Sequence, residues 1–65
     1  MTARLASTVI RGMSYSKGYL TLMFKKYDRV YECTTELAYK LAYSDNPTAF
    51  FNTNIKNKLR VVNTH

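Results

Sequence analysis

Cations and aromatic rings are the side chains that could do chemistry in this 65-residue chain. Ten Lys and Arg stand against four Asp and Glu, which gives a formal net charge of +6, and six residues are Tyr. All four acids lie between residues 28 and 45, so the two ends of the chain carry only positive charge. Such a balance favours a polyanionic partner, either nucleic acid or an acidic protein surface. A basic surface that only keeps the protein in solution gives the same count.

The basic and aromatic residues interleave in a way that is typical of single-stranded nucleic-acid binding. In such proteins cations follow the phosphate backbone while rings stack on bases. Lys25-Lys26-Tyr27 offers both kinds of side chain at a predicted hairpin tip, and we expect Tyr19 on an open sheet face with Arg11 and Arg29 nearby. A second basic cluster follows on the predicted last helix. The predicted nucleic-acid-binding residues are Arg11, Tyr19, Lys25, Lys26, Tyr27, Arg29, Lys56, Lys58 and Arg60.

Residues suited to catalysis or metal binding are scarce. The single His is His65, at the carboxyl end where chains usually fray, so a catalytic triad has no support. One His and one Cys cannot supply the three or four ligands that zinc requires. Cys33 is expected to be a small buried hydrophobe. We therefore predict a binding protein without enzymatic activity, metal or cofactor.

Cysteine usage and apolar runs suggest where the protein resides. A single cysteine cannot form an internal disulfide, so nothing points to an oxidising compartment. Residues 1–6 lack the apolar core of a signal peptide, and no apolar run is long enough to span a membrane. The expectation is a soluble, cytoplasmic protein without membrane contact.

β-branched residues and side-chain alternation together predict three strands. β-branched residues favour a strand over 7–15, and apolar and polar side chains alternate over 19–24 and again over 29–34. Ser16-Lys17-Gly18 is a short break with Gly18 at a positive φ, and 25–28 is a connection of hairpin length. The strands are therefore expected to pair as consecutive hairpins.

Two helices are expected after the strands. Good helix formers occupy 36–43, with Thr34 or Thr35 available as the N-cap. Asn46-Pro47 marks a second helix start, and apolar residues then recur every four positions from Phe51 to Leu59. Residues 61–65 are expected to fray.

The predicted fold is α+β: a three-stranded antiparallel sheet followed by two helices packed on one face. The whole chain, 1–65, forms one small domain with an ordered core of about 7–60. The predicted buried residues are Ile10, Leu20, Leu22, Phe24, Tyr31, Leu37, Leu41, Phe51, Ile55 and Leu59. The other sheet face, left open to water or a partner, carries Tyr19, Thr21, Met23, Val30 and Glu32.

Three segments together resemble the KTSC domain, a short module at the carboxyl end of some lysyl-tRNA synthetases that also occurs alone in bacteria and phages. The segments read Ile10-x-x-Met13-x-Tyr15, then Leu20-x-Leu22-x-Phe24 with Tyr31 in the next strand, then Ala42-x-Ser44 with Phe50-Phe51-Asn52-x-x-Ile55-Lys56. The family has Tyr-x-Tyr in its central strand, where this chain has Tyr31-Glu32-Cys33. The resemblance implies a small sheet with helices and an RNA-binding role, and it implies no enzyme.

Two functions of different kinds fit these observations. The first is a small nucleic-acid-binding module for RNA or single-stranded DNA, with RNA preferred because of the resemblance. The alternative is a phage-type small protein that binds and inhibits a host enzyme or defence complex. That alternative would use Tyr19, Met23 and Val30 on the open face, because Tyr and Met are enriched at protein interfaces. The sequence leaves the oligomeric state open.

Overall fold

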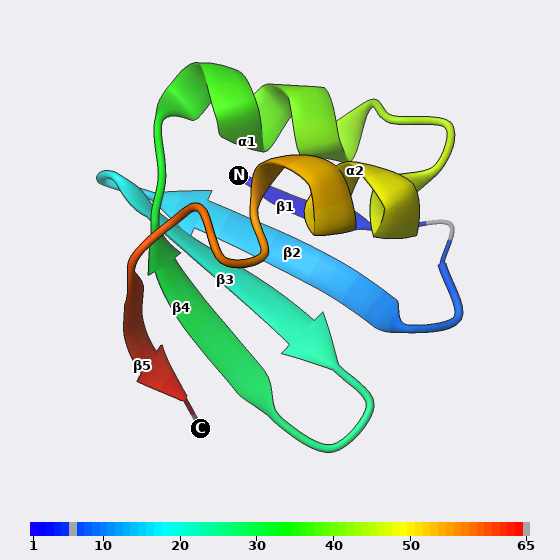
Figure 1. Cartoon of the computed structure of the whole chain (residues 1–65), viewed down its shortest axis with the longest axis horizontal. Helices are drawn as coiled ribbons and strands as arrows, with labels where there is room; N and C mark the ends of the chain where they lie inside the picture. The colour runs from blue at the N-terminus through cyan, green and yellow to red at the C-terminus, as the bar shows by residue number, and fades with distance from the viewer. Residues whose placement is uncertain (6, 65) are drawn as a thin grey trace.

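The computed structural model describes residues 1–5 and 7–64 as an antiparallel sheet with two helices on one face (Figure 1). The five strands follow the same order in the sheet as along the chain. Every neighbouring pair is antiparallel. The α+β class is therefore as predicted. The elements are β1 (Thr2–Arg4), β2 (Ile10–Ser16), β3 (Tyr19–Phe24), β4 (Asp28–Glu32), α1 (Thr35–Ala42), α2 (Pro47–Asn54) and β5 (Val61–Thr64).

The three central strands, β2, β3 and β4, correspond to the strands predicted over 7–15, 19–24 and 29–34, although β2 begins only at Ile10 and β4 already ends at Glu32. Leu20 is opposite Tyr31 on β4 and opposite Tyr15 on β2, and directly opposed residues share a sheet face. That face carries the helices. A two-residue turn joins β2 to β3, with Lys17 at φ 51° and Gly18 at φ 85°, and this left-handed pair suits the twist of a hairpin. The positive φ predicted for Gly18 is confirmed.

The predicted number of three strands is wrong, because β1 and β5 extend the sheet at both edges. β1 pairs with β2 through Ala3 and Met13, and β5 pairs with β4 through Asn63 and Val30. Both strands lie outside the predicted ordered core of 7–60, and the expected fraying over 61–64 is not observed. With three and four residues, they are too short to show an alternating pattern in the sequence. His65 lies outside the described residues.

The predicted helix starts are confirmed by their caps. The Thr34 hydroxyl accepts a hydrogen bond from the backbone N–H of Leu37 at 3.2 Å, and the Asn46 side chain accepts one from Ala49 at the same distance. The second helix is shorter than its apolar spacing predicts. It ends at Asn54, and Asn57 then adopts a left-handed φ of 62°. The chain after α2 is therefore a series of turns.

The core lies between the helices and the sheet and is mostly the predicted one. Phe24, Leu37 and Leu59 are only partly buried and pack against its margin. Cys33 is buried, as expected. The remaining predicted residues are buried, namely Ile10, Leu20, Leu22, Tyr31, Leu41, Phe51 and Ile55. The sequence analysis missed further buried residues, among them Leu5, Met13, Ala38 and Pro47.

Candidate nucleic-acid interface

A β-bulge in β2 determines how the first cation of the candidate site is presented. Ile10 pairs with Phe24 and Gly12 with Met23, which leaves Arg11 as the extra, exposed residue. The bulge also reverses the alternation of β2, so that Ile10 and Met13 are both fully buried although they are three residues apart. Gly12 consequently belongs to the open face of the sheet, the face away from the helices, beside Met23.

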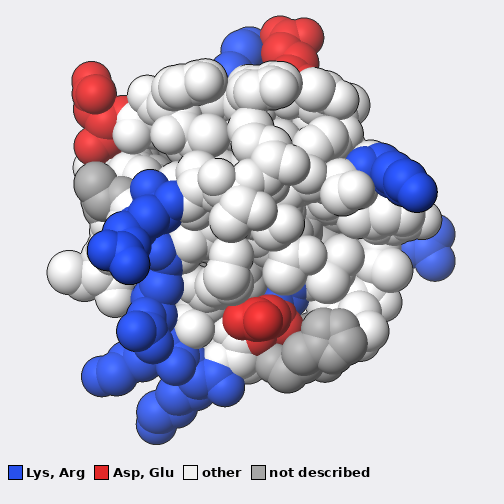
Figure 2. All heavy atoms as spheres, turned by 180° about the vertical axis from the view of Figure 1, so that it is seen from behind, with Lys and Arg blue, Asp and Glu red and all other residues white. Residues whose placement is uncertain are grey.

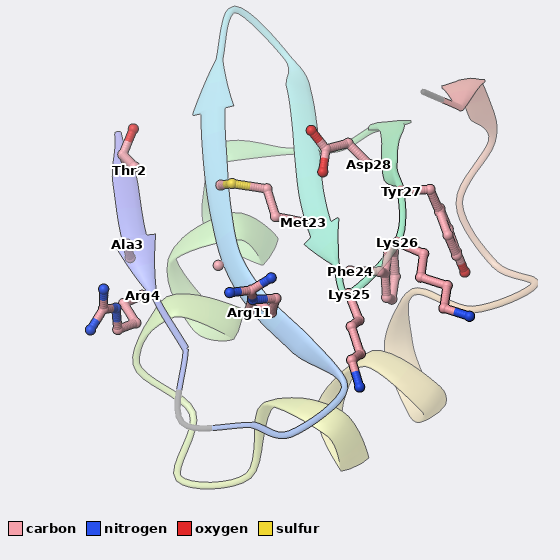
Figure 3. Close-up of a pocket in the computed structure, with 11 residues that line it drawn as sticks. Thr2, Ala3, Arg4, Arg11, Met23, Phe24, Lys25, Lys26, Tyr27 and Asp28 are labelled. Atoms are coloured by element: carbon pink, nitrogen blue, oxygen red, sulfur yellow. The ribbon is translucent and has the colours of Figure 1, made fainter.

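Three further cations join Arg11 at this end of the sheet. Arg4 of β1 pairs with Gly12, so it lies on the open face, and Lys25 and Lys26 come from the turn between β3 and β4. All four side chains are exposed. Figure 3 shows them following one another across the strands, and Figure 2 shows blue side chains gathered along one margin of the molecule. We call Arg4, Arg11, Lys25 and Lys26 the basic row.

The basic row borders a hollow of about 740 Å³ on the open face. Gly12 is buried, because the Met23 side chain lies over it. A Cβ placed there would lie 3.2 Å from the carbonyl oxygen of Ala3 and 3.4 Å from the Cε of Met23. Met23 therefore extends across the position that a larger residue would fill. Figure 3 shows its side chain reaching from β3 toward β2. Asp28, directly opposite Met23 on β4, directs its carboxylate over the same face (Figure 3).

The hollow is electropositive. Its lining contains the four cations of the basic row and Asp28 as its acid, a formal balance of 4 − 1 = +3. Within the described residues, no ion pair engages the basic row. The ion pair between Lys40 and Glu36, at 3.1 Å, lies on α1. Neighbouring strands are about 4.8 Å apart, so cations on adjacent strands can contact successive negative groups of one polymer.

Tyr27 lines the hollow beside Lys25 and Lys26, but much of its ring already packs within the protein. The ring stacks on Phe24 with centroids 4.9 Å apart, and the guanidinium carbon of Arg29 lies 5.1 Å from the ring centre. Tyr27 remains 38% exposed. Its outer edge is thus available to a ligand, while its stacking surface mainly supports the turn that carries Lys25 and Lys26.

The predicted placement of Arg29 beside Tyr19 on the open face is wrong. Arg29 pairs with Leu22, which points to the helices, so Arg29 lies on the helix face and contacts Tyr27 from there. Its Nε is buried without a hydrogen-bond partner. Tyr19 is on the open face and 47% exposed, as expected, but it begins β3, whereas the basic row lies where β3 ends. At about 3.4 Å per residue, this separates Tyr19 from the row by more than 10 Å along the strand.

The second predicted basic cluster does not join the row. Lys56, Lys58 and Arg60 are exposed and follow α2, so their predicted position on the last helix is wrong. The carbonyl of Arg60 accepts a hydrogen bond from the N–H of Glu32, the residue paired with Tyr19. The cluster therefore leads toward the Tyr19 end of the sheet. None of these three residues lines the hollow that the basic row borders.

Sequence reasoning missed Arg4, Gly12 and Asp28 as residues of the site. No signal in the sequence marks Arg4, because β1 is only three residues long. Gly12 did carry a signal, since an isolated glycine inside a strand pattern often marks a bulge or a close backbone approach. A bulge at that position would have predicted both the outward Arg11 and the hollow beside it.

Comparisons with protein-family models, curated proteins and solved structures found no match for this chain. The resemblance to the KTSC domain thus stays a prediction. Neither helix in the described part of the chain is long and apolar enough to cross a membrane. Across residues 1–5 and 7–64, no three His, Cys, Asp or Glu side chains are grouped so that they could hold a metal ion.

Proposed function

We propose that this chain is a nucleic-acid-binding module that holds the phosphate backbone of a single strand with the basic row. The observation that carries the proposal is the convergence of four exposed cations from β1, β2 and the β3–β4 turn on one margin of the sheet. Phosphate contacts from Lys and Arg supply most of the affinity of sequence-independent nucleic-acid binding. The outer edge of Tyr27 and the thioether of Met23 add apolar contacts beside the row.

The finer parts of the proposal rest on the sequence. RNA is preferred over DNA because of the resemblance to the KTSC domain. A cytoplasmic location follows from the lone cysteine, and a binding role without catalysis follows from the scarcity of catalytic side chains. Lys56, Lys58 and Arg60 are not part of the proposed contact, because they lie apart from the hollow.

Salt-dependent binding of the purified protein tests this proposal. Fluorescence anisotropy with single-stranded RNA, single-stranded DNA and duplex should give the tightest binding to single strands. If four cations engage, the slope of log K against log salt should be about −2.8 on a single strand. Absence of binding to every nucleic acid at about 50 mM salt would overturn the proposal.

A protein partner is the second candidate, and exposed apolar groups away from the basic row favour it. Tyr19 is 47% exposed, and Val61 and Val62 of the edge strand β5 are 46% and 47% exposed. Such groups serve as anchors in protein interfaces. A phage-type inhibitor of a host enzyme would use them with little dependence on salt. A pull-down from host lysate that captures one protein with the unchanged chain, and loses it with Tyr19→Ala, would support this candidate.

A further inference from the structure

The hollow beside the basic row combines an apolar floor with one acid, and this combination suits a nucleobase. We propose that the hollow is a base-reading subsite that favours bases with an exocyclic amino group, with the Asp28 carboxylate as the acceptor. This inference rests on the proposed function. It adds the part of the ligand that the hollow recognises, because the row alone contacts only phosphates.

The floor of the hollow matches the face of a base. Because Gly12 has no side chain, Met23 can lie across β2, with its Cε 3.4 Å from where a Cβ would be, and its thioether forms the floor. A thioether packs favourably against aromatic rings. The volume of about 740 Å³ falls within the range of small-molecule sites, so a base can enter while its phosphates remain at the row.

Asp28 gives the hollow its selectivity. It lies opposite Met23 on the open face, and among the described residues no hydrogen bond or ion pair occupies its carboxylate. An ionised carboxylate only accepts hydrogen bonds. The N4 amino group of cytosine can donate to it, whereas the O4 carbonyl of uracil is an acceptor and would be repelled. The negative charge of Asp28 repels the phosphates of a nucleic acid and so weakens their binding to the basic row. Recognition of a hydrogen-bond donor on a base therefore explains an acid in the hollow better than attraction of the nucleic-acid strand does.

Paired oligomers test the inference without any change to the protein. Fluorescence anisotropy with labelled cytidine and uridine octamers, both RNA, compares two ligands of equal charge and length. We expect cytidine to bind about five- to tenfold more tightly, the discrimination of a single good contact to a base edge. Deoxycytidine octamers distinguish a contact to the base, which DNA would retain, from a contact to the ribose.

Two variants with the same change of charge locate the effect. Asp28→Asn removes the carboxylate charge and supplies an amide that can face either base, so the ratio of cytidine to uridine affinity should fall to about one. Glu32→Gln is the matched control, because Glu32 lies on the same strand and face but pairs with Tyr19 outside the hollow. It should raise both affinities and preserve the ratio. Circular dichroism melting verifies that both variants fold.

The outcomes separate this inference from the proposed function. A cytidine preference that Asp28→Asn abolishes and Glu32→Gln preserves supports the subsite. Equal, salt-sensitive binding of both octamers overturns the subsite and leaves phosphate binding by the row intact. A preference that survives Asp28→Asn also overturns it, because the acceptor would then lie elsewhere. No binding of either octamer at low salt overturns both proposals.

Discussion

Removal of two cations from the basic row should change how nucleic-acid binding responds to salt. The double variant Lys25→Gln/Lys26→Gln takes both lysines from the β3–β4 turn and leaves Arg4 and Arg11 in place. Both lysines are exposed, so the substitutions leave the core unchanged. Lys56→Gln/Lys58→Gln is the matched control, because it lowers the net charge by the same amount away from the hollow.

The expected magnitude follows from the number of phosphate contacts. Each contact on a single strand contributes about −0.7 to the slope of log K against log salt, so four contacts give about −2.8 and two give about −1.4. A rise from about 50 to about 200 mM salt should then weaken the unchanged protein about 50-fold and the row variant only about 7-fold. The control variant should keep the steeper slope, although long-range attraction lowers its affinity slightly.

Fluorescence anisotropy titrations of a labelled single-stranded RNA at four salt concentrations give these slopes directly. Melting curves of all three proteins verify that the fold is retained. The reasoning is refuted if the two double variants have the same slope, because total charge, and no particular row of cations, would then set the affinity. It is equally refuted if the row variant keeps the slope of the unchanged chain.

Three further predictions concern stability and reactivity. Leu41→Ala empties a fully buried position and should lower the free energy of unfolding in urea by about 2–5 kcal/mol; a loss below about 1 kcal/mol would contradict the core described above. Gly18→Ala meets no atom within 4 Å, so its left-handed backbone alone should cost about 1–2 kcal/mol in the same assay, whereas no measurable loss would mean a different turn. Burial raises the pKa of the Cys33 thiol, and a backbone hydrogen bond from Ala38 offsets part of this, so less thiolate is present at any given pH. Alkylation by iodoacetamide at about pH 8 should therefore be slower in the folded protein than in urea, and equal rates would show that the thiol is accessible.

The central part of the fold could be predicted because its signals are local. Alternation in β3 fixes which side chains meet the helices, and the Thr34 and Asn46 caps mark where the helices begin. The edge strands could not be predicted, since β1 and β5 acquire their structure from pairing with β2 and β4. Strands of three or four residues have no pattern of their own.

The residues of the candidate site were predicted in part, and the missed or wrongly placed residues have two separate causes. Lys25, Lys26 and Arg11 meet because a hairpin tip and a bulge lie at the same end of the sheet. Arg4 depends on a strand that the sequence does not reveal. The error on Arg29 was avoidable, because a residue two positions before the buried Tyr31 must share its face.

The basic row exists only in the folded chain, because β1, β2 and the β3–β4 turn meet through strand pairing. A ligand bound there is therefore thermodynamically linked to folding. At a free concentration of a hundred times its Kd, such a ligand adds about 2.7 kcal/mol to the stability of the native state. For a domain of 65 residues, that is a large share of the total. Occupancy by nucleic acid would thus also protect the protein from proteolysis, so its lifetime in a cell would follow the supply of its ligand.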